Sequence, residues 1–326
     1  MKRHCIRNIR LLAVYLIGGI IASTFLFIAF MNISWNNWMI YLCLVTALLI
    51  MGAGAIYIVY DRMHRKIISF TRQLEASIAE QKQRETEMNM ACRIQQRFLP
   101  RPVELPACID LVAELHQSRE VGGDLYDFFL LDRHLYFAIG DVSGKGIPAA
   151  LYMTSMSKLF HYVAQNHAST AEICTILNNQ MCDSQDDIYA TLFIGILNLD
   201  TGVLTYTNAG HTYPLCFRSE PHIDFIEQYP DVPVGILEDY SFNEYTHTLD
   251  KGCSLLFYTD GITDAEDPSG SFYGKERLIA CVEACTHKAS KKIILTIMDE
   301  INTHISTRRQ SDDLTLLLIK YNGADA

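Results

Sequence analysis

The chain has 326 residues, which is enough for one sizeable folded domain with accessory segments. It is 49% hydrophobic with a formal net charge of −10, but residues 1–60 contain no acidic residue, whereas residues 100–326 contain 32 of the 37 acidic and only 15 of the 27 basic residues. A domain this acidic repels phosphate backbones and suits divalent cations, which argues against nucleic acid as a partner.

Two long uncharged segments open the chain. Residues 11–31 and 39–60 are each long enough to cross a hydrocarbon core of about 30 Å as a helix. The connection between them is short and polar, and its Trp35 and Trp38 suit a membrane interface. We therefore predict two transmembrane helices that form a hairpin within residues 1–60 and contact membrane lipid.

The orientation of the hairpin follows from its basic residues. They precede the first span (Lys2, Arg3, Arg7, Arg10) and follow the second (Arg62, Arg65, Lys66), and the connection has none. The positive-inside rule then places both termini in the cytoplasm. A cleaved signal peptide is the alternative for the first span, although that span is long for one and no clean small-x-small cleavage site precedes Asn32. The connection is too short to fold into a sensor domain.

A charged segment, residues 61–99, follows the hairpin and contains neither glycine nor proline. Ile67, Phe70, Leu74 and Ile78 follow the 3–4 spacing of an amphipathic helix. We predict a helical linker that forms a parallel coiled coil in a homodimer. A single exposed helix that continues the second span is the alternative.

Residues 100–326 have the pattern of a separate α+β domain. Apolar segments bounded by turn residues predict strands at Leu135–Asp141, Tyr189–Asn198, Val203–Asn208, Phe242–Leu249, Cys253–Thr259 and Leu314–Tyr321. Helices are expected at Pro148–Asn166, Ser169–Cys182, about Lys275–His287 and Lys288–Ser306. Paired helices among hairpin-connected strands favour a layered α+β domain over a parallel α/β sheet.

Four aspartates, Asp124, Asp141, Asp260 and Asp312, stand at the ends of apolar strands beside glycine or small residues. Any one of them alone reads more easily as a turn residue. Together they predict one catalytic site, because a buried carboxylate must be paired or bound to a metal. Oxygen ligands select Mg²⁺ or Mn²⁺, and two such ions activate water for phosphoester hydrolysis.

The motifs around these aspartates carry a family resemblance. They are Ala91-x-x-Ile-Gln-Gln-x-Phe-Leu-Pro100, Val121-Gly-Gly-Asp-x-Tyr-Asp127, Gly140-Asp-Val-Ser-Gly-Lys-Gly-x-Pro-Ala-Ala150, Asn208-Ala-Gly-His211, Pro233-x-Gly235, Tyr258-Thr-Asp-Gly-Ile-Thr-Asp264 and Asp312-Asp-Leu-Thr315. In this order, residues 91–321 resemble the bacterial PPM (protein phosphatase 2C-like) serine/threonine phosphatases of the SpoIIE/RsbU type. The resemblance implies an αββα sandwich with two Mn²⁺ or Mg²⁺ ions between the sheets.

The resemblance also implies the metal ligands. Asp124 and Asp141 would hold the ions, with Asp141 bridging them and the Val142 carbonyl adding an oxygen. Asp260 and Asp312 would complete the ligand set. Asp312 rather than its neighbour Asp313 matches the ligand position of the last motif, although both are candidates. Asp264 would bind a third, weaker ion.

The implied substrates are phosphoserine or phosphothreonine proteins, among them anti-anti-sigma factors of the STAS fold, and the implied location is the cytoplasmic (inner) membrane of a bacterium. Many relatives carry an N-terminal sensory domain, whereas residues 1–99 are predicted to form two spans and a helix, so the input signal stays open. The chain lacks a clear equivalent of the phosphate-binding arginine of eukaryotic relatives, for which Arg101 and Arg119 are the nearest candidates. The role of Asn208 and His211 stays open between catalysis and structure.

Two other function classes compete with a phosphatase. A membrane-tethered scaffold with an inactive phosphatase fold would be favoured by the loss of a ligand, but all four aspartates are present. A nucleotide cyclase also uses two metal-binding aspartates, but the Asp312-Asp-Leu-Thr315 ending does not fit one. The ten cysteines include no Cys-x-x-Cys pair, so we expect reduced core residues rather than a zinc site.

Overall fold

The computed structural model describes residues 13, 17–21, 24–25, 27–28, 35–100, 104–182, 188–218, 222–226, 229 and 231–324. The chain divides into two compact units, residues 1–83 and residues 84–326. One long helix, α2 (Trp35–Gln95), covers the second predicted span and most of the predicted linker.

The apolar stretch of α2 is the one candidate membrane span among the described residues. Its candidate region begins at Tyr41, reaches a mean hydropathy of 2.5, and none of that window is buried within the protein. The first predicted span, residues 11–31, lies mostly outside the described residues, although its described positions are helical.

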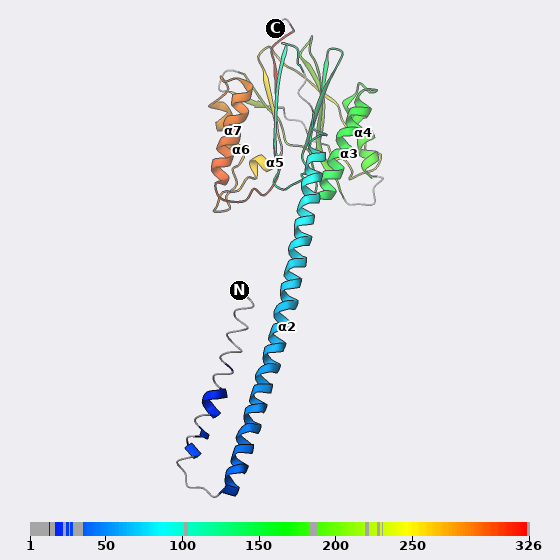
Figure 1. Ribbon diagram of the computed structural model, residues 1–326. Coiled ribbons are helices and arrows are strands. Elements are labelled where there is room, and N and C mark those ends of the chain that lie inside the picture. Colours follow the sequence, from blue (N-terminus) through cyan, green and yellow to red (C-terminus); the bar gives the residue numbers. More distant parts are fainter. Residues whose placement is uncertain are drawn as a thin grey trace. The chain divides into compact units, whose positions relative to one another are not determined.

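Two five-stranded sheets form the second unit, and every hydrogen-bonded pair of strands is antiparallel. Sheet A has the order β1 (Ile109–His116), β10 (Leu314–Tyr321), β9 (Ser254–Tyr258), β6 (Leu215–Phe217), β7 (Ile223–Phe225). Sheet B has the order β2 (Leu125–Leu131), β3 (His134–Val142), β4 (Ala190–Asn198), β5 (Val203–Ala209), β8 (Tyr245–Thr248). The two sheets face each other (Figure 1).

The central strands are buried on both faces. Along β3, Leu135 and Phe137 pack between the sheets, whereas Tyr136 and Ala138 face the helices that cover sheet B. The strands β9 and β10 alternate in the same way between the inter-sheet core and the helices over sheet A. Because side chains alternate across a strand, burial on both faces produces the unbroken apolar runs seen in the sequence.

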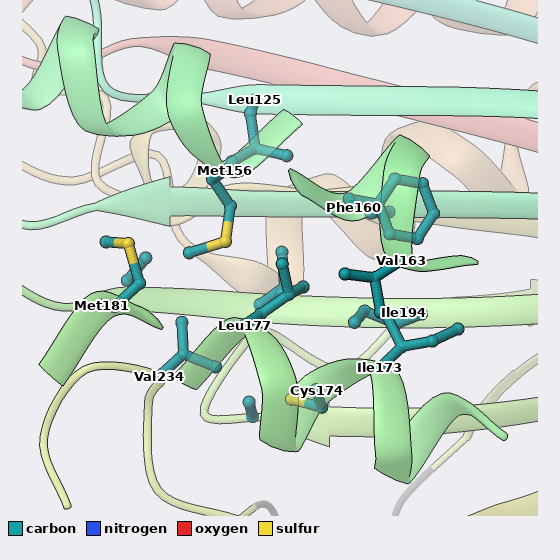
Figure 2. Packing of buried hydrophobic residues seen from close by; sticks show 14 of the residues in the cluster. Leu125, Met156, Phe160, Val163, Ile173, Cys174, Leu177, Met181, Ile194 and Val234 are labelled. Carbon is teal, nitrogen blue, oxygen red and sulfur yellow. The ribbon is translucent and has the colours of Figure 1, made fainter. Parts of the chain in front are cut away.

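Helices cover the outer face of each sheet. Sheet B is covered by α3 (Ile147–Ala164) and α4 (Thr170–Cys182), and sheet A by α6 (Lys275–Glu283) and α7 (Ser290–Ile305), as Figure 1 shows. Figure 2 shows Phe160 of α3, Leu177 of α4 and Ile194 of β4 in the same buried cluster. The predicted αββα sandwich is therefore confirmed.

The elements differ from the predicted ones mainly at the edges. The predicted strand Phe242–Leu249 is wrong in length, because β8 covers only Tyr245–Thr248. The segment before β8 is held by Asp231 instead of by β5. The Asp231 carboxylate accepts hydrogen bonds from the backbone amide of Asn243 at 2.8 Å and from the Tyr240 hydroxyl at 3.0 Å. The strands β1, β2, β6 and β7 and the single-turn helix α5 (Asp260–Thr263) were not among the predicted elements.

Phe160 is the fully buried anchor of α3, and its replacement tests the packing of the helix layer on sheet B. We expect Phe160→Ala to lower the free energy of unfolding by about 3–5 kcal/mol, because it removes buried apolar area and leaves a cavity. The matched control is Tyr162→Ala on the same helix, which is 71% exposed and should change stability by less than about 0.5 kcal/mol. Urea denaturation of the full-length chain in detergent, followed by circular dichroism, measures both. Equal losses would contradict the assigned packing.

Candidate active site

Asp124 connects the two sheets at one end of the sandwich. It directly precedes β2 of sheet B, and its side chain is only 2% exposed. Its Oδ2 atom accepts hydrogen bonds from the hydroxyls of Thr259, at 2.7 Å, and Thr315, which belong to the end of β9 and to β10 of sheet A. Burial and the charges of Asp141 and Asp313 raise the pKa of Asp124 well above its usual value.

Asp313 organises the loop that carries Asp124. Its buried carboxylate accepts hydrogen bonds from the backbone amides of Ser118, at 2.7 Å, and Gly123, at 2.9 Å. A side chain at Gly122 would overlap this carboxylate, and one at Gly261 would overlap the Asp313 carbonyl oxygen. Only glycine therefore allows these backbones to lie this close together.

The remaining acidic side chains meet near the same end. Burial, followed by the charge of Asp260, raises the pKa of Asp141 to about 7, and Asp312 and Asp313 add to this rise. Partial burial and the charge of Asp312 raise the pKa of Asp260, although its side chain reaches solvent. The structure thus brings together the aspartate cluster: Asp124, Asp141, Asp260, Asp312 and Asp313.

A lysine that the sequence analysis did not single out lies beside the cluster. The Lys145 ammonium donates hydrogen bonds to Oδ2 of Asp312 and to the carbonyl of Ser311, both at 2.7 Å. Lys145 belongs to the loop between β3 and α3, four residues after Asp141. Its position in the glycine-rich motif was the sequence signal that could have found it.

The donor set of the cluster suits a hard divalent cation. Its members are carboxylates whose charges repel each other, and a cation between them would remove that repulsion. Across the described ranges no three His, Cys, Asp or Glu side chains already stand in metal-binding geometry. Threonine hydroxyls hold Asp124, and Lys145 holds Asp312.

Two further predicted ligands lie beside the cluster. The Val142 amide donates to the Gly123 carbonyl at 3.4 Å, so the backbones next to Asp141 and Asp124 run together. Asp264 is exposed at the end of α5, and its amide donates to the Asp260 carbonyl at 2.8 Å. Its charge contributes to the raised pKa of Asp260.

Asn208 and His211 form a buried turn. The Asn208 side chain accepts a hydrogen bond from the His211 amide at 2.8 Å and donates one to the His211 carbonyl at 3.1 Å. The His211 ring contacts the Thr191 hydroxyl at 3.0 Å, and burial lowers its pKa to about 4, so it is neutral at pH 7. All these contacts stabilise the turn after β5.

Gln95, in the last turn of α2, is bound to the loop that precedes Asp124. Its side-chain amide donates to the Gly122 carbonyl at 2.7 Å and accepts from the Gly122 amide at 3.3 Å. The Gln117 side chain donates to it at 2.7 Å, and Gln95 is buried to 3% exposure. Gln95 is an uncharged polar residue on the core face of the predicted helix. This feature of the sequence could have predicted that its side chain binds another polar group.

The fold defined by the two facing sheets and their helix layers is that of PP2C-type domains. The SiaA-PP2C domain of Pseudomonas aeruginosa superposes with a TM-score of 0.66 at 17% identity, covering 74% of this chain and 99% of that domain. The family model for stage II sporulation protein E (SpoIIE) matches residues 132–322, so the chain belongs to the SpoIIE family.

Two relatives extend the match. Protein IcfG of Synechocystis is 30% identical over 268 residues, which cover 72% of this chain and 42% of IcfG. Phosphoserine phosphatase RsbU of Bacillus subtilis is 24% identical over 241 residues, which cover 74% of this chain and 71% of RsbU. The chain therefore matches less than half the length of IcfG.

The neighbours Asp312 and Asp313 have separable roles that stability measurements can test. We expect Asp313→Ala to cost about 2–3 kcal/mol, because it leaves the Ser118 and Gly123 amides without their charged acceptor. The control Asp312→Ala removes a partly exposed ion pair and should cost no more than about 1 kcal/mol. Urea denaturation with a chelator present isolates this effect from metal binding. A larger loss for Asp312→Ala would reverse the assignment.

Proposed function

We propose that this chain is a membrane-anchored, Mn²⁺- or Mg²⁺-dependent phosphatase of phosphoserine and phosphothreonine proteins. The observation that carries the proposal is the aspartate cluster, in which burial and the charges of neighbouring carboxylates raise the pKa of Asp124, Asp141 and Asp260. Membership of the SpoIIE family and the similarity to a phosphoserine phosphatase of Bacillus subtilis support the same activity.

The roles of the aspartates follow from their positions. Besides burial, the charges of Asp260, Asp312 and Asp313 raise the pKa of Asp141. A carboxylate with acidic neighbours on several sides is suited to bridge two ions. Asp124, fixed by two threonine hydroxyls, and the more accessible Asp260 and Asp312 are the other ligands, with the Val142 carbonyl beside them. Asp313 accepts hydrogen bonds from backbone amides, so its role is to position the loop that carries Asp124. Asp264 would bind a third ion.

A pair of bound ions would supply a water of lowered pKa and a clamp for the phosphoryl oxygens. The protein's own residues then orient the phosphoester. Lys145 is partly exposed and bonded to Asp312, so its ammonium can bind an incoming phosphoryl oxygen. Asp260 and Asp312 reach solvent, which lets the cluster meet a phosphorylated side chain at the surface of another protein.

The substrate class is a phosphorylated regulatory protein, and a STAS-type anti-anti-sigma factor is the specific candidate. The likeness to RsbU and to phosphoserine phosphatase RsbP, also of Bacillus subtilis, favours phosphoserine. RsbP is 25% identical over 239 residues, which cover 57% of its length.

The activity is tested with the full-length chain in detergent, manganese and a phosphoserine peptide. We expect metal-dependent release of phosphate, and Asp141→Asn should lower the rate at least about 100-fold, since outer-shell changes alone cost 10–100-fold. The control Asp110→Asn replaces an exposed aspartate of β1 and should leave the rate unchanged. Hydrolysis without metal, or at the same rate in Asp141→Asn, would refute the proposal.

The membrane anchor and the dimer rest on residues 1–99. The exposed apolar stretch that begins at Tyr41 supports insertion into the cytoplasmic membrane, with both termini and the phosphatase domain inside the cell. Ile67, Phe70, Leu74 and Ile78 are each more than half exposed in the single chain, which supports their pairing with a second copy.

The topology is tested by reporter fusions after residue 66 in a bacterial host. We expect a green fluorescent protein fusion to fluoresce and an alkaline phosphatase fusion to stay inactive, because the basic residues that follow the second span hold this point in the cytoplasm. An active alkaline phosphatase in the undeleted chain would rule out the hairpin.

A further inference from the structure

Cys216 of β6 and Cys253, which directly precedes β9, touch each other in sheet A. Cys216 of β6 pairs with Leu255 of β9, and Cys253 lies two residues before Leu255, so both cysteine side chains are on the same face of the sheet. Their Sγ atoms are 3.1 Å apart, and both thiols are free. A disulfide needs a distance of about 2.05 Å, which the pair reaches by a movement of about 1 Å.

The two thiols differ in their access to solvent. Cys253 is 3% exposed and belongs to the core between the sheets, whereas Cys216 is only partly buried. Both line a cavity of about 380 Å³, whose wall also includes Arg218, His247 and Asp250. This volume admits water and small solutes, so a small oxidant can reach the Cys216 sulfur from outside.

The surroundings also distinguish the attacking sulfur from the resolving one. A hydrogen bond from the Cys253 thiol lowers the pKa of Cys216, and the Arg218 guanidinium acts in the same direction. The reciprocal hydrogen bond and burial raise the pKa of Cys253. Because the thiolate is the nucleophile, Cys216 is the sulfur that reacts first.

We propose that Cys216 and Cys253 are a redox modification site, at which hydrogen peroxide converts the two thiols into an intramolecular disulfide. The Cys216 thiolate attacks the O–O bond, which breaks; the sulfur becomes a sulfenic acid, and hydroxide leaves and takes up a proton to form water. Cys253 then attacks the sulfenic sulfur, and the S–S bond forms as a second water leaves. The two thiols lose two electrons, and the peroxide is reduced to two waters.

The disulfide would join β6 to the start of β9. That strand ends two residues before Asp260 of the aspartate cluster, so the modification lies on the element that positions part of the proposed active site. The oxidation chemistry itself does not depend on phosphatase activity, and the two proposals can fail separately.

The chain contains an internal comparison. Cys281 and Cys285 also influence each other's pKa through a shared hydrogen bond, but they belong to α6 and the turn after it and are only 5% and 0% exposed. They are a second pair of neighbouring cysteines with much less access to an oxidant. Preferential reaction at Cys216 and Cys253 would therefore reflect access and not only proximity.

The test treats the folded full-length chain in detergent with hydrogen peroxide, then blocks free thiols with iodoacetamide under denaturing conditions. Peptide mass spectrometry should find Cys216 and Cys253 in one cross-linked species lighter by two hydrogen atoms, and their alkylation should fall at least tenfold while that of Cys281 and Cys285 does not. Dithiothreitol should restore alkylation. Full alkylation of both thiols after peroxide, or a cross-link that forms only in urea, overturns the proposal.

Single substitutions separate the two sulfurs. In Cys253→Ser, Cys216 should stop at the sulfenic acid, which dimedone traps, whereas in Cys216→Ser the Cys253 thiol should stay free. Cys182→Ser is the control and should keep the cross-link. Thermal unfolding checks that each variant is folded, and Cys253→Ala replaces Cys253→Ser if the serine is not tolerated at the buried position. Dimedone labelling of neither Cys253 variant, with the fold intact, would also overturn the proposal.

Discussion

Repulsion between carboxylates governs one end of this sandwich. Asp124, Asp141 and Asp260 each have a raised pKa, because each is at least partly withdrawn from water and faces other acids. Such a group is retained only when the surrounding structure holds it in place. Here the two threonine hydroxyls that bind Asp124 come from the opposite sheet, so the contact that restrains the charge also fastens sheet A to sheet B. The fold and the proposed chemistry therefore depend on the same few bonds.

The loop around Gly122 is where several of these restraints meet. Asp313 binds its amides from one side, and Gln95 binds Gly122 through both donor and acceptor from the other. A displacement of the last turn of α2 must consequently alter the backbone two residues before Asp124. The hydrogen bonds of Gln95 therefore connect the last turn of α2 to the cluster through the loop that carries Asp124.

The sequence alone predicted the layered fold and the four aspartates, because both leave local signals. Strands buried on both faces appear as apolar runs, and Asp141 and Asp260 stand beside glycine where those runs end. It did not predict contacts whose partners are far apart in the chain. Thr259 and Thr315 bind Asp124 across more than 130 residues, and Lys145 reaches Asp312 across 167. The length of β8 was overpredicted because the backbone before it is bound by Asp231, which no pattern within 242–249 reveals.

The crowded glycines have a consequence for how such a site can change over generations. Neither Gly122 nor Gly261 has room for a methyl group, and both are blocked by atoms of the same residue, Asp313. A lineage that replaced one of these glycines would need a compensating shift of β10, on which the inter-sheet core also rests. Inactive descendants are therefore expected to lose the exposed carboxylates Asp260 and Asp312 first and to keep Gly122 and Gly261 longest. The two glycines would then mark the position of the former site.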